Sequence, residues 1–340
     1  MDTSQRSWSG DLVDAYAHIG NPKYGTLADV DHFINRLSIQ QAVLALGPGI
    51  PDLASLILAR QRYGDRIRYM GIPFGETAAQ RFELGLLQIK MGISGMRFMP
   101  NELAPNRGLI DKLGEAALCL YAINPLDSPN TMRFLIDWLE QFPKGNVASP
   151  HFIRPTTVEA QVTDIGLAKT LLQHPRYHAI FSRQGGTGTT EPYPHRDLLP
   201  WVEQMAALVT WKRILWGSEF PIIYQRNEQP EQVRDWLLDL GVSFTTQDQF
   251  GFFANNTRQL FFANPPPVME PITIPGWVQS QIDQTDTVYL FPANRVFIPM
   301  QTHRLLLSDY LERCQAIPDL RFADYIAQVL SKHAETLSGE

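Results

Sequence analysis

The sequence predicts an α/β protein, a (β/α)8 barrel of the TIM type with a C-terminal extension. Short apolar stretches alternate with longer amphipathic ones from the N-terminus to about Phe261. Their nearly continuous hydrophobicity is typical of parallel strands that helices cover on both faces. The chain has 340 residues, of which 44% are hydrophobic and 19% charged, so it is long enough to form one such barrel around a large core.

Eight predicted strands follow one another along this part of the chain. They are residues 12–18 (LVDAYAH), 41–47 (QAVLALG), 67–74 (IRYMGIPF), 94–100 (SGMRFMP), 117–123 (ALCLYAI), 146–151 (NVASPH), 177–182 (YHAIFS) and 213–218 (RILWGS). Between them lie stretches with apolar residues at helical spacing, such as residues 131–142 (TMRFLIDWLEQF). An open doubly wound sheet is the alternative arrangement. The barrel is preferred because no Gly-x-Gly-x-x-Gly motif follows the first strand.

The composition changes after residue 262. Residues 263–277 (ANPPPVMEPITIPGW) are rich in proline and are predicted to form a linker or a strap along the surface. Residues 286–301 are β-like, and two helices are predicted over residues 303–315 and 319–337. We therefore expect a barrel over residues 1–262 and an extension over residues 263–340. This extension is apolar enough to need burial, either as a cap on the barrel or as a contact in a homodimer.

Charge and cysteine content exclude several classes of function. The net charge of −6 and the isoelectric point near 5.8 argue against a nucleic-acid partner. Two cysteines, Cys119 and Cys314, are too few for a disulfide framework or a thiolate metal site. The N-terminus is polar, and no apolar run approaches the length of a membrane span. A soluble, cytoplasmic protein with no membrane partner is the expectation.

Polar side chains gather at the predicted ends of the strands, where the active site of a parallel barrel lies. Two imidazoles, a carboxylate, a guanidinium and a phenol come from four different strands at this end. They belong to Tyr16, His18, Arg97, His151 and Glu219. Barrel enzymes assemble their sites from several strand ends in this way.

Four motifs resemble the amidohydrolase-related family, the branch with aromatic-acid decarboxylases and dicarboxylate lactone hydrolases. LVDAYAHIG (12–20) resembles the opening strand of this family, and FPKGNVASPHFIRP (142–155) resembles a later strand that ends in a functional His. RILWGSEFP (213–221) is similar to its Gly-Ser-Asp-hydrophobic-Pro signature, and FFANNTRQLF (252–261) is similar to its closing helix. The motifs keep the family's order from about residue 10 to residue 262. The resemblance implies the same barrel fold.

Carried over position by position, the family's ligand set falls on Tyr16, His18, His151 and Glu219. Tyr16 stands where a His or Glu is usual, and Glu219 stands where an Asp is usual. Tyrosine is neutral at pH 7 and is a poor metal ligand, which leaves His18, His151 and Glu219 as good donors. We therefore expect no metal, and the alternative is one divalent zinc or manganese ion held by those three residues.

The predicted function is hydrolysis of a small carboxylated ester or lactone without a metal. In this interpretation His18, His151 and Glu219 are catalytic, with His151 or Glu219 as the general base on water. Arg97 binds a substrate carboxylate, and Tyr16 donates a hydrogen bond to the developing oxyanion. Arg97 is also compatible with a salt-bridged residue at the barrel rim.

Two alternatives remain open. One is a metal-dependent decarboxylase or amidohydrolase in which Tyr16 is a bystander. The other is a non-catalytic barrel whose extension binds a partner, because two of the four site positions depart from the family pattern. A barrel fold by itself does not decide between them.

Overall fold

The structure is a computed structural model in which most of the chain is described. It describes residues 7–20, 24, 26–47, 51–153, 165–186, 188–225, 228–278, 287–290 and 296–299, with residues 306, 309, 310, 312, 313, 315–317, 320, 325, 328 and 329.

Eight parallel strands form one sheet whose order follows the sequence, with each strand paired to the next. They are β1 (Val13–Ile19), β2 (Gln41–Leu46), β3 (Ile67–Gly71), β4 (Gly95–Phe98), β5 (Cys119–Ala122), β6 (Asn146–Ser149), β7 (Tyr177–Phe181) and β8 (Ile214–Trp216). All eight predicted strands are confirmed. Most of the observed strands are shorter than the apolar stretches that predicted them.

Strand β3 shows why a strand can end before the apolar stretch that predicts it. It ends at Gly71 although the apolar stretch continues to Phe74. The side chain of Gln88 takes over the backbone pairing of Ile72, since its Oε1 accepts from Ile72 N at 3.0 Å and its Nε2 donates to Ile72 O at 2.8 Å. This buried amide replaces the sheet hydrogen bonds, so the chain leaves the sheet there.

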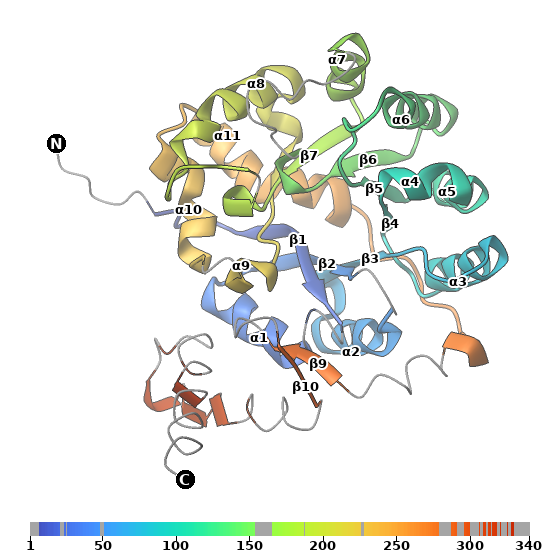
Figure 1. Ribbon diagram of the computed structural model, residues 1–340, viewed down its shortest axis with the longest axis horizontal. Coiled ribbons are helices and arrows are strands. Elements are labelled where there is room, and N and C mark those ends of the chain that lie inside the picture. The colour runs from blue at the N-terminus through green and yellow to red at the C-terminus, as the bar shows by residue number, and fades with distance from the viewer. Residues whose placement is uncertain are drawn as a thin grey trace.

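The first strand and the segment after the last strand close the sheet into a barrel. Glu219 N donates to Tyr16 O and His18 N donates to Phe220 O, both at 2.7 Å. The barrel is therefore confirmed, and the open doubly wound sheet is excluded. Figure 1 shows the strands at the centre, with helices around them.

The helices follow the strands in alternation and cover the outside of the barrel (Figure 1). They are α1 (Leu27–Arg36), α2 (Leu53–Tyr63), α3 (Ala78–Lys90), α4 (Pro100–Leu103), α5 (Arg107–Glu115), α6 (Pro129–Gln141), α7 (Ile165–Gln173), α8 (Leu199–Val209), α9 (Ile222–Gln225), α10 (Pro230–Leu240) and α11 (Thr246–Phe250). Helix α6 illustrates the local causes. Ser128 Oγ accepts from Thr131 N at 3.1 Å, and Pro129 takes the first helical position. Its buried face carries Leu135 and Trp138 at helical spacing.

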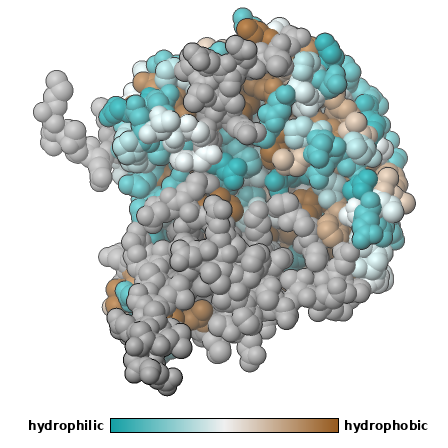
Figure 2. All heavy atoms as spheres, in the orientation of Figure 1, coloured by the Kyte–Doolittle hydropathy of each residue, from teal (hydrophilic) through white to brown (hydrophobic). Residues whose placement is uncertain are grey.

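The surface in Figure 2 agrees with this layering. On the face drawn there, the described residues are mostly hydrophilic, and hydrophobic residues are scattered between them. Among the described residues, no helix combines the length and the apolar character needed to cross a bilayer.

Two π-helical segments follow α11, η7 (Gly251–Asn255) and η8 (Arg258–Phe262), and η8 covers one end of the barrel. Phe261 packs against the side chains inside the barrel, and its carbonyl accepts from Nε of the buried Arg68 at 2.9 Å. Since Arg68 lies near the N-terminal end of β3, this plug lies at the end where the strands start. A functional site is therefore expected at the opposite end of the barrel, where the strands end.

The proline-rich stretch is a strap along the surface of the barrel. Arg60 on α2 donates to Pro267 O at 2.8 Å, and Glu270 N donates to Lys90 O at 2.9 Å. Farther along, the Trp277 ring stacks on Phe74 with centroids 6.1 Å apart. The strap therefore crosses α2 and the end of α3 and reaches the loop after β3. The division of the chain into two domains stays a prediction.

The rest of the extension contains the predicted β-like segment. Strands β9 (Thr287–Leu290) and β10 (Val296–Pro299) pair antiparallel. The described residues between 306 and 316, and residues 325, 328 and 329, are helical, and all of them except residue 316 fall within the two predicted helices. Tyr310 is buried, and its hydroxyl lies 2.9 Å from Nε2 of His32 on α1. The extension thus contacts the barrel at α1, and a homodimer through it stays a prediction.

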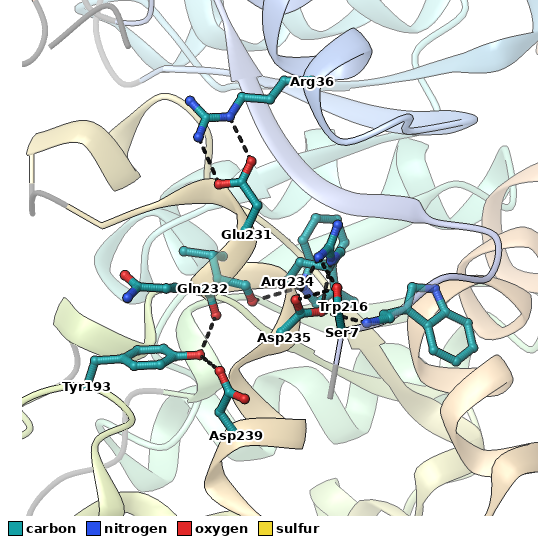
Figure 3. A network of polar contacts seen from close by, with 11 residues as sticks. Ser7, Arg36, Tyr193, Trp216, Glu231, Gln232, Arg234, Asp235 and Asp239 are labelled. Carbon is teal, nitrogen blue, oxygen red and sulfur yellow. Dashed lines mark hydrogen bonds and ion pairs between the residues drawn. The ribbon is translucent and has the colours of Figure 1, made fainter. Parts of the chain in front are cut away.

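Helix α10 ties three parts of the barrel together, as Figure 3 shows. Glu231 makes two hydrogen bonds of 2.8 Å with the guanidinium of Arg36 on α1. Asp235 accepts from Trp8 N at 2.9 Å and so holds the segment before β1. Trp216 at the end of β8 donates to Val233 O at 3.3 Å. These contacts hold α10 beside the β8–β1 closure.

Candidate functional site

The five residues singled out in the sequence lie at the C-terminal end of the barrel. Tyr16 and His18 come from β1, and Arg97 comes from β4. His151 lies two residues past the end of β6, and Glu219 lies three residues past the end of β8. The Tyr16 ring lies 4.6 Å from the His18 ring and 5.4 Å from the His151 ring, centroid to centroid. The structure therefore brings the strand-end residues into one cluster at the end opposite the π-helical plug.

Glu219 is the acidic centre of this cluster. Its carboxylate is buried, with Oε1 lying 3.0 Å from Nε2 of His151 and 3.0 Å from Nε of Arg183. The Arg183 nitrogen also donates to Oε2 at 3.2 Å. Arg183 lies one residue past a predicted strand end and was not among the predicted site residues. Its position just after β7 is the sequence signal that could have identified it as a site residue.

Tyr16 offers a hydrogen bond that nothing in the described structure accepts. Its side chain is fully buried between the two imidazoles, and its hydroxyl has no hydrogen-bond partner among the described residues. Burial raises the pKa of Tyr16 to about 12, so the phenol is neutral at pH 7. A buried donor without an acceptor is costly, which points to a ligand or water oxygen at this place.

Arg97 carries a second unpaired donor. Its Nε is buried and lacks a partner among the described residues, and its positive charge acts on Tyr16 and His18. A guanidinium and a phenol that both face a buried site are suited to an anionic oxygen. A pocket of about 550 Å³ opens beside the ends of β3 and β4, and Glu102, whose charge acts on Arg97, lines it together with Phe74.

His18 is held in one orientation by the barrel and by a loop residue. Its Nδ1 lies 3.2 Å from Ala45 O, and its ring stacks on Tyr24 at 4.2 Å with an interplanar angle of 11°. Because a carbonyl only accepts, Nδ1 carries the proton and Nε2 keeps its lone pair. Burial, with the charge of Arg97, lowers the pKa of His18 well below its usual value. Tyr24 was not among the predicted site residues and lies outside every predicted strand.

We expect His18 to make the folded protein sensitive to acid. Below about pH 6.5 the unfolded chain protonates His18 while the folded chain does not, so the free energy of unfolding falls as the pH is lowered. In His18→Gln this contribution is lost, and the decline should be shallower by up to about 1.4 kcal/mol per pH unit, with the largest difference at the acid end of the range. Urea denaturation between pH 5 and pH 7 measures both slopes. His174→Gln is the control with a smaller effect, because Glu140 at 3.3 Å favours the charged form of His174. Parallel curves for wild type and His18→Gln would contradict the assignment.

His151 forms a buried hydrogen-bonded pair with Glu219. Burial lowers the pKa of His151, and the Glu219 charge opposes that shift. A neutral His151 donates from Nε2 to the carboxylate and keeps a lone pair on Nδ1. An imidazole that is held by a carboxylate through one ring nitrogen can use its other ring nitrogen to take a proton from a nucleophile.

Strained backbone lies where the strands end at the site. His151, Phe152, Ile153, Arg183 and Glu219 all have left-handed φ angles, between 55° and 63°. Each such residue costs about 1–2 kcal/mol relative to right-handed backbone when it is not glycine. Backbone strain of this kind gathers at functional sites, where the surrounding structure holds it in place.

Asp14 and Ser218 support the site from inside the barrel, and neither was among the predicted site residues. Asp14 Oδ1 accepts from Tyr16 N at 2.9 Å and from Ser218 N at 3.1 Å, and Oδ2 accepts from the Ser218 hydroxyl. The Ser218 oxygen in turn accepts from Phe220 N at 2.9 Å. Both residues lie within the quoted motifs. Asp14 is two residues before Tyr16, and Ser218 directly precedes Glu219.

The donor set at this site does not fit a divalent metal ion. Among the residues that the structure describes, no three side chains of His, Cys, Asp or Glu are grouped so that they could hold one. Glu219, whose carboxylate lies beside His151, is already paired with the cationic Arg183 and with that histidine. A metal would have to compete with the guanidinium for the same oxygens, and the neutral phenol of Tyr16 occupies the place between the imidazoles.

Comparisons with known proteins bear on the fold. No protein-family model matches this sequence, and no curated protein sequence matches it significantly. Solved structures do match. A probable 2-pyrone-4,6-dicarboxylic acid hydrolase from Acinetobacter baumannii aligns over 74% of this chain and all of its own, with 16% identity and a TM-score of 0.56. An amidohydrolase from Burkholderia multivorans with bound zinc aligns over 74% of this chain and 99% of its own, with 10% identity and a TM-score of 0.57.

A 2,6-dihydroxybenzoate decarboxylase is also similar, covering 75% of this chain and all of its own at 13% identity, with a TM-score of 0.50. These three proteins are of the types named by the family resemblance in the sequence. The resemblance is thereby confirmed at the level of structure: the chain has the barrel fold that amidohydrolases, dicarboxylate lactone hydrolases and aromatic-acid decarboxylases share.

Proposed function

We propose that this protein is a hydrolase that cleaves the C–O bond of a small carboxylated ester or lactone without a metal ion. One observation carries the proposal. Two buried donors without partners among the described residues, Tyr16 Oη and Arg97 Nε, lie in the same cluster as a hydrogen-bonded His151–Glu219 pair. A hydrolase of esters needs this combination of anion binding, oxyanion stabilisation and a base.

In the proposed reaction His151 removes a proton from water while Glu219 stabilises the imidazolium that forms. The water oxygen bonds to the carbonyl carbon, and Tyr16 donates to the oxygen that becomes negatively charged. The C–O bond to the leaving oxygen then breaks, and the proton passes from His151 to that oxygen. An acid and an alcohol result, or a hydroxy acid from a lactone.

The remaining residues bind and orient. Arg97 holds the carboxylate of the substrate, because a guanidinium matches a carboxylate through two parallel hydrogen bonds. Arg183 pairs with the Glu219 carboxylate and holds it in place through contacts of 3.0 and 3.2 Å. His18, with its lone pair on Nε2, is proposed to orient the attacking water.

The alternative is a metal-dependent decarboxylase or amidohydrolase, and one observation favours it. A similar barrel, the Burkholderia multivorans amidohydrolase, holds zinc. His18, His151 and Glu219 are then the candidate ligands. The pairing of Glu219 with Arg183 opposes this alternative.

Assays with and without a chelator test the proposal. Purified protein, dialysed against a strong chelator, should hydrolyse carboxylated lactones or aryl esters at the same rate as untreated protein. Elemental analysis of both samples should find far less than one metal ion per chain. A rate that falls on chelation and returns with zinc or manganese would reject the metal-free mechanism, and release of carbon dioxide would identify a decarboxylase. No turnover of any substrate would favour the non-catalytic barrel.

A further inference from the structure

Three consecutive residues after β6 form a left-handed turn. The φ angles of His151, Phe152 and Ile153 are 61°, 55° and 57°, and none of the three is a glycine. The β-branched Ile153 is especially unsuited to this conformation. Single non-glycine residues visit it occasionally, but a run of three persists only when the surroundings hold it.

Two side-chain hydrogen bonds hold the turn from neighbouring elements. Ser182 Oγ, just past β7, accepts from His151 N at 2.9 Å. The Trp201 indole on α8 donates to Phe152 O at 3.0 Å. Within the turn, Ile153 N donates to Pro150 O at 3.3 Å.

The ring of Phe152 anchors the turn in an aromatic box. It is fully buried, and its edge-to-face partners are Phe181 at 4.1 Å and Trp236 at 5.4 Å between centroids, with Trp201 at 6.5 Å. These rings come from β7, α8 and α10. The turn is thus fixed by three elements that surround the site without being part of it.

The consequence of the turn is the position of His151. His151 is the first residue of the turn and lies two residues past the end of β6. Its Nε2 is 3.0 Å from the Glu219 carboxylate, and its ring centroid is 5.4 Å from that of Tyr16. We propose that Phe152, Ser182 and Trp201 are positioning residues that hold this left-handed turn and thereby keep the His151 imidazole against Glu219. The catalytic consequence rests on the proposed function, whereas the structural one does not.

Two mild variants and one matched control test the proposal. Trp201→Phe removes the indole donor to Phe152 O, and Ser182→Ala removes the acceptor for His151 N. Trp8→Phe is the control, because the partly buried Trp8 indole also donates to a carbonyl, that of Asp11, at 3.0 Å. We expect kcat to fall at least tenfold in both test variants with KM unchanged, and to stay within twofold of wild type in Trp8→Phe. The thermal unfolding midpoint should fall no further in Trp201→Phe than in Trp8→Phe, because the strained backbone relaxes.

Crystal structures of wild type and both test variants supply the readout that does not depend on turnover. The variants should show Phe152 outside the left-handed region and the His151 imidazole away from Glu219. Wild-type kcat in both variants would overturn the proposal, as would variants that keep the turn unchanged. If wild type hydrolyses none of the substrates, the proposed function has failed, and the crystal structures still decide whether Ser182 and Trp201 hold His151 in place.

Discussion

Replacing Glu219 with glutamine should lower the rate of hydrolysis by about 10²- to 10⁴-fold, the range expected when the general base His151 loses the carboxylate that supports it. The carboxylate accepts hydrogen bonds from His151 and Arg183, and its charge stabilises the imidazolium that forms when His151 takes a proton from water. Glutamine has nearly the same shape but no charge, and its amide nitrogen cannot accept from either partner. Steady-state rates on a carboxylated lactone measure the effect, and circular dichroism checks that the barrel is folded.

Glu231→Gln is the matched control for that substitution. Glu231 also pairs with an arginine, Arg36, through two hydrogen bonds of 2.8 Å, but it lies on α10 outside the site (Figure 3). Its replacement should leave the rate unchanged and cost at most about 1 kcal/mol of stability, as a partly exposed ion pair does. If Glu219→Gln turned over substrate as fast as Glu231→Gln, Glu219 would not belong to the catalytic machinery.

Replacing Arg97 with glutamine should lower kcat/KM for a carboxylated substrate by about 10- to 150-fold. This range follows from the roughly 1.5–3 kcal/mol that a hydrogen bond to a charged group contributes. Arg97 is suited to this role because its Nε is buried without a partner among the described residues. The loss should appear mainly in KM, since the carboxylate is bound equally in the ground state and the transition state. Initial rates over a range of substrate concentrations separate the two parameters.

A pair of substrates provides the control for Arg97. The methyl ester of the substrate carboxylate keeps the reacting bond but removes the charge, so wild type and Arg97→Gln should process it at similar rates. Arg97→Lys should recover part of the loss, because lysine keeps the charge and loses the two-point geometry. Equal losses on both substrates would show that Arg97 stabilises the site rather than binding a carboxylate.

Much of the fold could be predicted from local sequence. Parallel strands buried on both faces need nearly continuous apolar runs, so the eight strands of the barrel were visible as such runs. Their ends were less predictable. Strand β3 stops at Gly71 because Gln88, 17 residues later in the chain, bonds to the backbone of Ile72. A contact of this kind depends on how α3 packs on the sheet.

The site was predictable to the extent that it depends on strand ends. Because the C-terminal ends of parallel strands meet at one end of a barrel, the positions of Tyr16, His18, Arg97, His151 and Glu219 in the sequence were enough to predict that they gather there. Their catalytic and binding roles stay predictions. The proline-rich composition likewise indicated a linker or a strap, and only its contacts with α2 and α3 distinguish the two.

Three features of the site were decided by tertiary structure alone. Arg183 pairs with Glu219, Asp14 joins Tyr16 to Ser218, and a left-handed turn presents His151. The first two link residues that are 36 and 204 positions apart, so no local pattern could reveal them. The turn opposes the local preference of its own residues, and it persists because Ser182, Trp201 and the aromatic box surround it. Hydrophobic pattern is a property of neighbouring residues, whereas pairing of charges and backbone strain depend on elements that only the closed barrel brings together.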